Sequence, residues 1–252
     1  MSTHSTSWGN VADWYDDLLA ADGDTFQAKV ILPNLRRLLS IQKGQKILDL
    51  ACGQGFFARE FALAGATVVG ADIAPELVAR AKARVSGVKF IVAPAHRVSA
   101  VADQTMDVVT IILALQNIEN VAEVFRECAR VLQPGGHLAL VLNHPAFRVP
   151  RSSGWGWDEK KLIEYRRIDQ YLAEAKIKID MHPGEKKRQY TVSFHRPLQV
   201  YFKHLAKAGF AVTKLEEWIS HRPPPKGRVF AARDRARKEI PLFMYLEAIR
   251  RP

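Results

Sequence analysis

Residues 46–58 read KILDLACGQGFFA, and their pattern is the most informative one in the chain. It opens with a short apolar run (46–51), typical of a buried strand, and Gly53 and Gly55 follow before a helical pattern begins. Glycines allow the backbone to turn sharply and to approach a ligand closely at the carboxyl end of a strand. The pattern therefore predicts a strand, a ligand-binding turn and a helix. A tight turn without a ligand is the structural alternative.

Strands and helices alternate outward from this turn. Strands are expected at 66–72, 88–93, 107–113 and 137–143, and helices at 56–64, 75–84 and 121–132. Before the turn, residues 9–40 carry apolar positions at helical spacing, which predicts two lead-in helices. Strands of this length alternating with helices of about ten residues indicate βαβ units, so we expect a doubly wound α/β fold with a parallel sheet.

The alternation stops after Asn143. Residues 145–192 contain no convincing βα unit, and the rhythm resumes with a helix at about 197–208 and a strand at about 210–218. A basic, proline-containing connection (219–239) leads to a final apolar stretch at 240–249. We interpret the chain as one domain, residues 1–252, with lead-in helices (1–44), a cofactor-binding core (45–145), an insertion over the carboxyl edge of the sheet (146–192) and a closing part (193–252).

Composition excludes several classes of protein. The chain is 48% hydrophobic and 25% charged, and no apolar run approaches the ~18 residues of a membrane span. Two cysteines, Cys52 and Cys128, are too few for a disulfide framework or a four-ligand zinc site, and we expect no metal. The first ten residues lack the basic and apolar regions of a secretory signal, so we expect a cytoplasmic protein.

The net charge of +11 is unevenly placed. Residues 1–140 hold 13 Lys and Arg against 14 Asp and Glu, whereas residues 141–252 hold 24 against 12. A one-sided basic field attracts anions such as RNA, phosphates or carboxylates. A solvated basic surface that only keeps the protein soluble is the alternative.

Asp49 distinguishes between the two cofactor classes that use such a turn. Gly53, Gly55 and Ala58 also satisfy the G-x-G-x-x-G/A pattern of dinucleotide enzymes, but a carboxylate repels the pyrophosphate of a dinucleotide. S-adenosylmethionine (SAM) instead brings a cationic amino group and a sulfonium, which a carboxylate stabilises. Asp72, at the end of the second strand, could accept hydrogen bonds from the ribose hydroxyls, or it could cap the helix at Pro75.

The joint pattern resembles class I SAM-dependent methyltransferases. The resemblance rests on ILDLACGQG, VVGADIAPELVARAKAR and MDVVTIILALQNIENVAEVFRECARVLQPGGHLALV, over roughly residues 45–145, and more loosely on 194–218 and the closing IPLFMYLEA. It implies a Rossmann-like seven-stranded sheet whose last strand is antiparallel and lies between strands five and six. It also implies cofactor contacts from Tyr15, Asp49, Ala51, Gly53, Gly55, Asp72, Leu113 and Gln116, and Ile73 is expected to pack on the adenine.

One position departs from the family. After strand three the family commonly places an acidic residue that reads the adenine amino group, whereas residues 92–96 read VAPAH. Either His96 or the backbone takes this role, or packing alone holds the adenine. His96 could equally be a surface histidine.

Methyl transfer from a sulfonium requires alignment and exclusion of water, and a general base only for a protonated acceptor. The candidate bases lie near the end of strand five and in the insertion: His144, Tyr165, Tyr171 and His195. His144 could instead satisfy loop backbone, and the tyrosines could fill a lid.

Two acceptors are consistent with the sequence. The first is a small molecule, anionic or aromatic, covered by the insertion: Trp155 and Trp157 would enclose it, and Arg166 and Arg167 would bind its charge. In the alternative, the tryptophans only pack the insertion onto the sheet and the arginines face water. RNA on the basic carboxyl-terminal part is the second acceptor. A NAD-dependent oxidoreductase is disfavoured by Asp49, and a non-catalytic SAM-binding protein remains an alternative. S-adenosylhomocysteine (SAH) would be the product, and the oligomeric state is not predicted.

Overall fold

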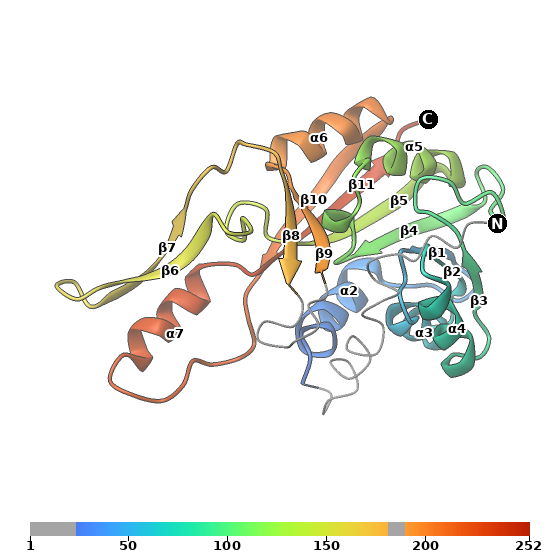
Figure 1. The fold of residues 1–252 in the computed structure, drawn as a ribbon. Coiled ribbons are helices and arrows are strands. Elements are labelled where there is room, and N and C mark those ends of the chain that lie inside the picture. Colours follow the sequence, from blue (N-terminus) through green and yellow to red (C-terminus); the bar gives the residue numbers. More distant parts are fainter. Residues whose placement is uncertain (1–23, 181–189) are drawn as a thin grey trace.

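The computed structural model describes residues 24–180 and 190–252, and a seven-stranded sheet forms its centre (Figure 1). The order of the strands is β10-β11-β5-β4-β1-β2-β3. The first five strands of the chain run parallel, and β11 is antiparallel to both of its neighbours, β5 and β10. This confirms the predicted sheet and the position of its last strand. The strands are β1 (Lys46–Leu50), β2 (Thr67–Asp72), β3 (Lys89–Val92), β4 (Met106–Ile112), β5 (Leu132–Asn143), β10 (Phe210–Trp218) and β11 (Phe243–Arg250).

Helices cover both faces of the sheet because its central strands are apolar on both sides. On one face, α5 (Val121–Val131) and α6 (Leu198–Lys207) pack in a core with Leu48 and Leu50 of β1. On the other face, the helices that share a core with Ile47 are α2 (Leu32–Leu39), which continues the π-helix η2 (Gln27–Ile31), α3 (Phe56–Leu63) and α4 (Pro75–Arg84). Figure 1 shows these two layers above and below the strands.

The structure corrects the interpretation of residues 219–239 as a connection. Helix α7 (Phe230–Glu239) occupies the second half of this range. Only Ala236 of this helix is buried, so the helix lacks the apolar stripe by which sequence patterns reveal helices. Ion pairs one turn apart support it instead, since Asp234 lies 2.7 Å from both Arg237 and Lys238.

The insertion forms two antiparallel hairpins outside the central sheet. The first comprises β6 (Ser153–Asp158) and β7 (Ile163–Ile168), and the second comprises β8 (Ala175–Asp180) and β9 (Tyr190–His195). Figure 1 shows the first hairpin extending away from the sheet beside α7, whereas β9 packs against the 3-10 helix η3 (Leu115–Asn117) that follows β4. The part formed by β6, β7 and α7 is called the lobe below.

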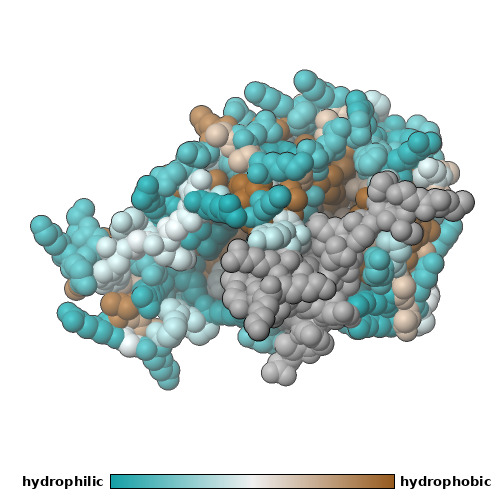
Figure 2. Space-filling model, in the orientation of Figure 1, coloured by the Kyte–Doolittle hydropathy of each residue, from teal (hydrophilic) through white to brown (hydrophobic). Residues whose placement is uncertain are grey.

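The lobe is hydrophilic on the face that Figure 2 shows, where most of its atoms are teal or white. Within the described ranges, 24–180 and 190–252, no helix combines the length and the hydropathy that a membrane span requires.

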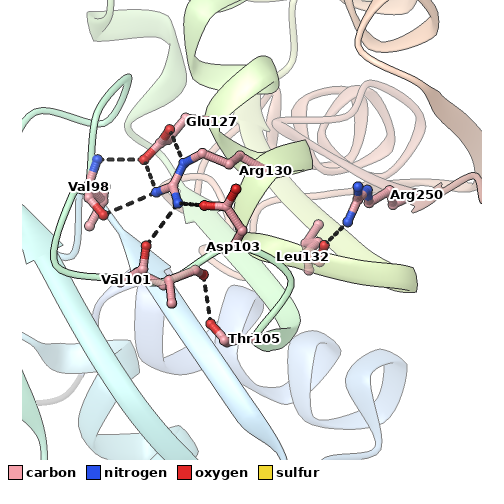
Figure 3. A network of polar contacts seen from close by, with 9 residues as sticks. Val98, Val101, Asp103, Thr105, Glu127, Arg130, Leu132 and Arg250 are labelled. Atoms are coloured by element: carbon pink, nitrogen blue, oxygen red, sulfur yellow. Dashed lines mark hydrogen bonds and ion pairs between the residues drawn. The ribbon is translucent and has the colours of Figure 1, made fainter.

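A polar network holds the loop between β3 and β4 against α5 (Figure 3). Glu127 accepts a hydrogen bond from the backbone of Val98 at 2.6 Å, and Arg130 donates to Glu127 at 2.6 and 2.9 Å. Arg130 also donates to the carbonyl of Val101 at 3.0 Å and pairs with Asp103. The network therefore positions the loop that begins beyond the carboxyl end of β3.

Candidate active site

The turn after β1 has the strained backbone that its glycines predict. Ala51, Gly53 and Gly55 have φ angles of 58°, 55° and 83°, so the chain reverses sharply before α3 begins. A Cβ at Gly55 would lie 2.8 Å from the ring of Phe90, so only glycine fits there. Ala51 adopts the left-handed conformation with a Cβ, at a cost of about 1–2 kcal/mol. Such strain is concentrated at ligand-binding positions.

Asp49 lies buried directly beneath this turn, with 2% of its surface exposed. Its Oδ1 accepts a hydrogen bond from the hydroxyl of Thr110 at 2.8 Å, and its Oδ2 has no partner among the described residues. Burial raises the pKa of Asp49 to about 7. A buried carboxylate oxygen without a donor is unfavourable by itself, so it fits a ligand that brings a cationic amino group.

The end of β4 lies next to this carboxylate. Leu113 has a φ of 54°, and its carbonyl accepts a hydrogen bond from Gln116 Nε2 at 2.7 Å. Gln116 Oε1 is buried without a partner among the described residues, like Asp49 Oδ2. Strand β1 pairs with β4 in the register Asp49–Thr110, so both unsatisfied acceptors belong to the carboxyl edge of adjacent strands. This edge suits a ligand rich in hydrogen-bond donors.

Asp72 connects the end of β2 to the glycine turn. Its carboxylate accepts hydrogen bonds from the backbone of Gly53 and of Ala74, both at 2.9 Å. The bond to Ala74, the residue that precedes α4, agrees with the capping alternative. Each carboxylate oxygen accepts two hydrogen bonds, so the same group retains acceptor capacity for a ribose. Burial raises the pKa of this carboxyl as well.

An apolar surface borders Asp72. Ile73 is 51% exposed, and Val92, which lies opposite Asp72 in the β2–β3 register, is 53% exposed. Exposed side chains of this size at the ends of adjacent strands suit the face of a planar base. His96 is also exposed in the loop beyond β3. Tyr15 lies outside the described residues.

His144 is held by contacts at both ring nitrogens. Its Nδ1 accepts from the backbone of Ala146 at 3.2 Å and of Phe147 at 3.3 Å, while Nε2 lies 2.6 Å from Glu217. This pattern leaves no lone pair for a substrate proton, and it agrees with the alternative in which His144 satisfies loop backbone. Burial lowers the pKa of His144.

The other three candidate bases have structural contacts in the insertion. His195 Nε2 donates to the carbonyl of Tyr171 at 2.8 Å, and the hydroxyl of Tyr171 accepts from the backbone of Leu198 at the start of α6. Tyr165 lies across Gly156, where a Cβ would approach its ring to 2.4 Å. The structure therefore brings Tyr171 and His195 together and places Tyr165 in the separate first hairpin.

The two arginines predicted to act together on the acceptor lie on opposite faces of β7, which corrects their pairing. Arg166 donates to the carbonyl of Phe147 at 2.9 Å and lies over the ring of Trp155, whereas Arg167 pairs with Asp169 at 3.0 Å with a largely exposed side chain. Successive residues of a strand point to opposite faces, so Arg166 and Arg167 cannot line one pocket. Trp155 and Trp157, two residues apart, share the face of Arg166.

Sequence reasoning missed a residue that the structure places beside Asp49. Thr110, the hydrogen-bond partner of Asp49, was detectable as the one hydroxyl residue in the apolar strand 107–113. In the insertion, the guanidinium of Arg148 lies over the ring of Trp155, and only the fold brings these two together. In the described part of the chain, no three His, Cys, Asp or Glu side chains are grouped as metal ligands.

Known proteins share this architecture. A family model described as a methyltransferase domain matches residues 48–140. The crystal structure of an S-adenosylmethionine-dependent methyltransferase from Mesorhizobium loti is 30% identical to this chain, with a TM-score of 0.70; the similarity covers 86% of this chain and 96% of that one.

Curated relatives match over a shorter range. A ubiquinone biosynthesis O-methyltransferase of Photobacterium profundum is 36% identical over 99 residues, which are 38% of this chain and 42% of the relative. A demethylmenaquinone methyltransferase of Chlorobaculum parvum is 33% identical over 125 residues, 49% of this chain and 52% of the relative. The chain thus spans about half or less of the length of these two relatives.

Proposed function

Because this chain belongs to the class I SAM-dependent methyltransferase family, we propose that it transfers the methyl group of SAM to a small-molecule acceptor. The observation that carries the proposal is the unsatisfied, buried Oδ2 of Asp49 beside a glycine turn. A pyrophosphate would be repelled at this carboxylate, which argues against a nicotinamide dinucleotide.

The residues at the carboxyl edge of the sheet match the successive parts of SAM, from its amino group to its adenine. Asp49 Oδ2 would accept a hydrogen bond from the amino group, with Ala51, Gly53 and Gly55 shaping the turn around the methionine part. Asp72 would accept from the ribose hydroxyls, and Ile73 would pack on the adenine. Gln116 Oε1 and Leu113, at the end of β4, would lie on the sulfonium side.

When bound, SAM supplies a methyl group that is already activated by its sulfonium. The chain then needs to hold the acceptor in line with this group and to exclude water. The two hairpins of the insertion follow β5 in the chain, and we assign them to the acceptor side, with Trp155, Trp157 and Arg166 on the face of the first hairpin that turns toward Phe147. Arg167 lies on the other face and is left out of this assignment.

A planar small molecule is the acceptor class that the relatives support. The two curated relatives are named for ubiquinone biosynthesis and for demethylmenaquinone, so aromatic, quinone-type compounds are the first acceptors to test. The basic second half of the chain is the feature that would favour RNA instead.

Calorimetry and methyl-label transfer test the proposal together. We expect SAM and SAH to bind and NAD not to bind, and we expect label from methyl-labelled SAM to enter small organic-extractable molecules. The Asp72→Ala variant should bind SAM several-fold to about a hundredfold more weakly, because ~1–3 kcal/mol of hydrogen bonding to a charged group is lost.

Three results would contradict parts of this proposal. Tight NAD binding without SAM or SAH binding would refute the cofactor. Label in RNA rather than in small molecules would replace the acceptor class. An unchanged SAM affinity of a folded Asp72→Ala protein would leave Asp72 with only its capping role.

A further inference from the structure

A cavity of about 270 Å³ lies at the base of the lobe. Segments far apart in the sequence line it: the residues before η2, the chain after β5, the β6–β7 hairpin, and the stretch from residue 220 to 242 that includes α7. None of the residues that line it belongs to the glycine turn or to the ends of β1, β2 and β4. The residues that the argument uses are Phe26, Arg148, Trp155, Arg222, Arg233 and Arg237.

The lining of this cavity is strongly cationic. It contains four arginines and one acidic residue, Glu164. Three of the arginines have a carboxylate nearby: Arg222 lies 3.7 Å from Asp24, Arg233 lies 3.4 Å from Glu164, and Arg237 lies 2.7 Å from Asp234. The fourth, Arg148, has no carboxylate partner among the described residues, and its Nε is buried without a hydrogen bond.

Arg148 is also close to a second cation. Its guanidinium lies 5.7 Å from the centre of the Trp155 ring, and that of Arg166 lies 5.3 Å from the same ring. Burial, with a contribution from Arg166, lowers the pKa of Arg148 to about 10. The indole ring attracts each guanidinium, but the two like charges repel one another, and a bound anion would reduce that repulsion.

Apolar surface completes the cavity. The aromatic rings of Phe26 and Trp155 line it together with Ile240 and Leu242. Its volume is slightly below the ~300–1,000 Å³ of sites for drug-sized ligands, so it suits a molecule of one or two rings.

We propose that this cavity binds a small organic oxyanion, a planar apolar body with a carboxylate or phosphate group, and that Arg148 is the principal ligand of the charged group. The fork of a guanidinium matches the geometry of both oxyanions, and the indole and phenyl rings contact the flat body. None of the residues that line the cavity belongs to the SAM edge, so anion binding here does not require SAM, although Trp155 also lies on the hairpin face assigned above to the acceptor side.

Benzoate, phenyl phosphate and the neutral analogue benzamide test this site on the full chain by calorimetry, with and without SAH. We expect both anions to bind at least tenfold more tightly than benzamide. Arg148→Met keeps an unbranched apolar stem without the guanidinium and its charge, and it should weaken the binding of both anions at least tenfold. Arg167→Met is the matched control, since Arg167 lies on the outer face of the same hairpin, paired with Asp169; it should change anion affinity less than twofold.

Thermal unfolding provides the second measurement. Phenyl phosphate should raise the Tm of the wild-type chain and of Arg167→Met, because a ligand that binds only the folded state stabilises it. Arg148→Met should have an unchanged or higher Tm without ligand, because an uncompensated partly buried charge is gone, and it should gain nothing from the anion.

The site is refuted if benzamide binds as tightly as benzoate, if neither anion binds saturably at millimolar concentration, or if both methionine variants lose the anion equally. The last result would assign the effect to the general basic charge of the lobe. Anion binding without SAM binding would contradict the proposed function and support this site. SAM binding without anion binding would support the proposed function and refute this site.

Discussion

At the scale of single residues, the site depends on charges that are buried before any ligand arrives. Asp49 is 2% exposed and retains one carboxylate oxygen without a partner among the described residues, while Ala51 and Leu113 hold left-handed backbone at the ends of the two adjacent strands. Each feature costs folding free energy, and the carboxylate oxygen would gain a partner when a cationic, donor-rich ligand binds. The residues at this edge are therefore arranged for binding rather than for stability.

Asp49→Asn tests this arrangement. The asparagine retains an acceptor for Thr110 but lacks the charge, so SAM affinity at pH 8 should fall about tenfold or more, as for loss of ~1.5–3 kcal/mol in a charged hydrogen bond. Because the pKa of Asp49 is raised to about 7 from about 3.9, its contribution to stability is complete below about pH 4 and is lost as pH rises through 7. The ligand-free variant should therefore be more stable than wild type at pH 8, and the difference should shrink toward pH 5.

Urea unfolding at both pH values and calorimetry measure these effects. Asp107→Asn is a suitable control, because Asp107 accepts from the backbone of Lys46 at the opposite edge of the same sheet. Equal losses of SAM affinity in the two variants would show that the effect is not local to the turn.

At the level of secondary-structure elements, side-chain networks hold the loops that connect the strands. The network in Figure 3 attaches the β3–β4 loop to α5 through Glu127 and Arg130. Burial alone would raise the pKa of Glu127, but the hydrogen bonds from Arg130 and Val98 outweigh it and the pKa is lowered. This ionised pair is therefore part of the folded state at neutral pH.

Glu127→Gln should lower the free energy of unfolding by about 1.5–3 kcal/mol at pH 7, because hydrogen bonds to a charged group are lost. Because the pKa of Glu127 is lower in the folded state, its carboxylate stabilises the fold above the unfolded-state pKa of about 4.3. This stabilisation is lost as the pH falls through the folded-state pKa. The stabilities of the variant and the wild type should therefore converge in denaturant titrations as the pH falls below the unfolded-state pKa. Glu123→Gln, in the same helix but in an exposed pair with Arg126, should cost less than ~1 kcal/mol; equal losses would contradict a special role of the network.

At the scale of the whole molecule, the sheet and the lobe are separable units. The β6–β7 hairpin makes no strand pairing with the central sheet, and its two ends meet, since the backbone N–H of Asp169 donates to the carbonyl of Ser152 at 2.7 Å. Arg166 of the hairpin instead donates to the carbonyl of Phe147 in the segment after β5, and β7 packs against α7.

Replacing residues 153–168 by a short Gly-Ser linker should therefore leave SAH affinity within a few-fold of wild type and abolish anion binding in the cavity, because Trp155 and Arg166 are removed. The same linker inserted at the exposed tip of the hairpin, between Glu159 and Lys160, should change neither property. Calorimetry with SAH and phenyl phosphate measures both. Loss of SAH binding in the folded deletion variant would show that the hairpin belongs to the cofactor site.

The strands and helices of the core follow from the sequence, because they depend on local order along the chain. Short apolar runs such as 46–51 and 107–113 favour buried strands, and the glycines at 53 and 55 place a turn directly after the first of them. Asp49 and Asp72 were predictable because each stands at the end of a strand, where parallel strands present their carboxyl ends to one edge. Helix α7 escaped prediction because its sequence lacks an apolar stripe.

Tertiary structure alone decided which distant side chains meet. The alternation of side chains along β7 separates Arg166 from Arg167, and the sequence pattern did not reveal this hairpin. The contacts of His144 with Ala146 and Glu217, which agree with its alternative role in the loop, likewise depend on the fold. The cavity of the lobe joins Phe26, Arg148, Trp155 and α7 across more than half of the chain. No local rule encodes such pairs, because the charge, burial and remaining hydrogen-bond capacity of each group are set by neighbours that only folding brings together.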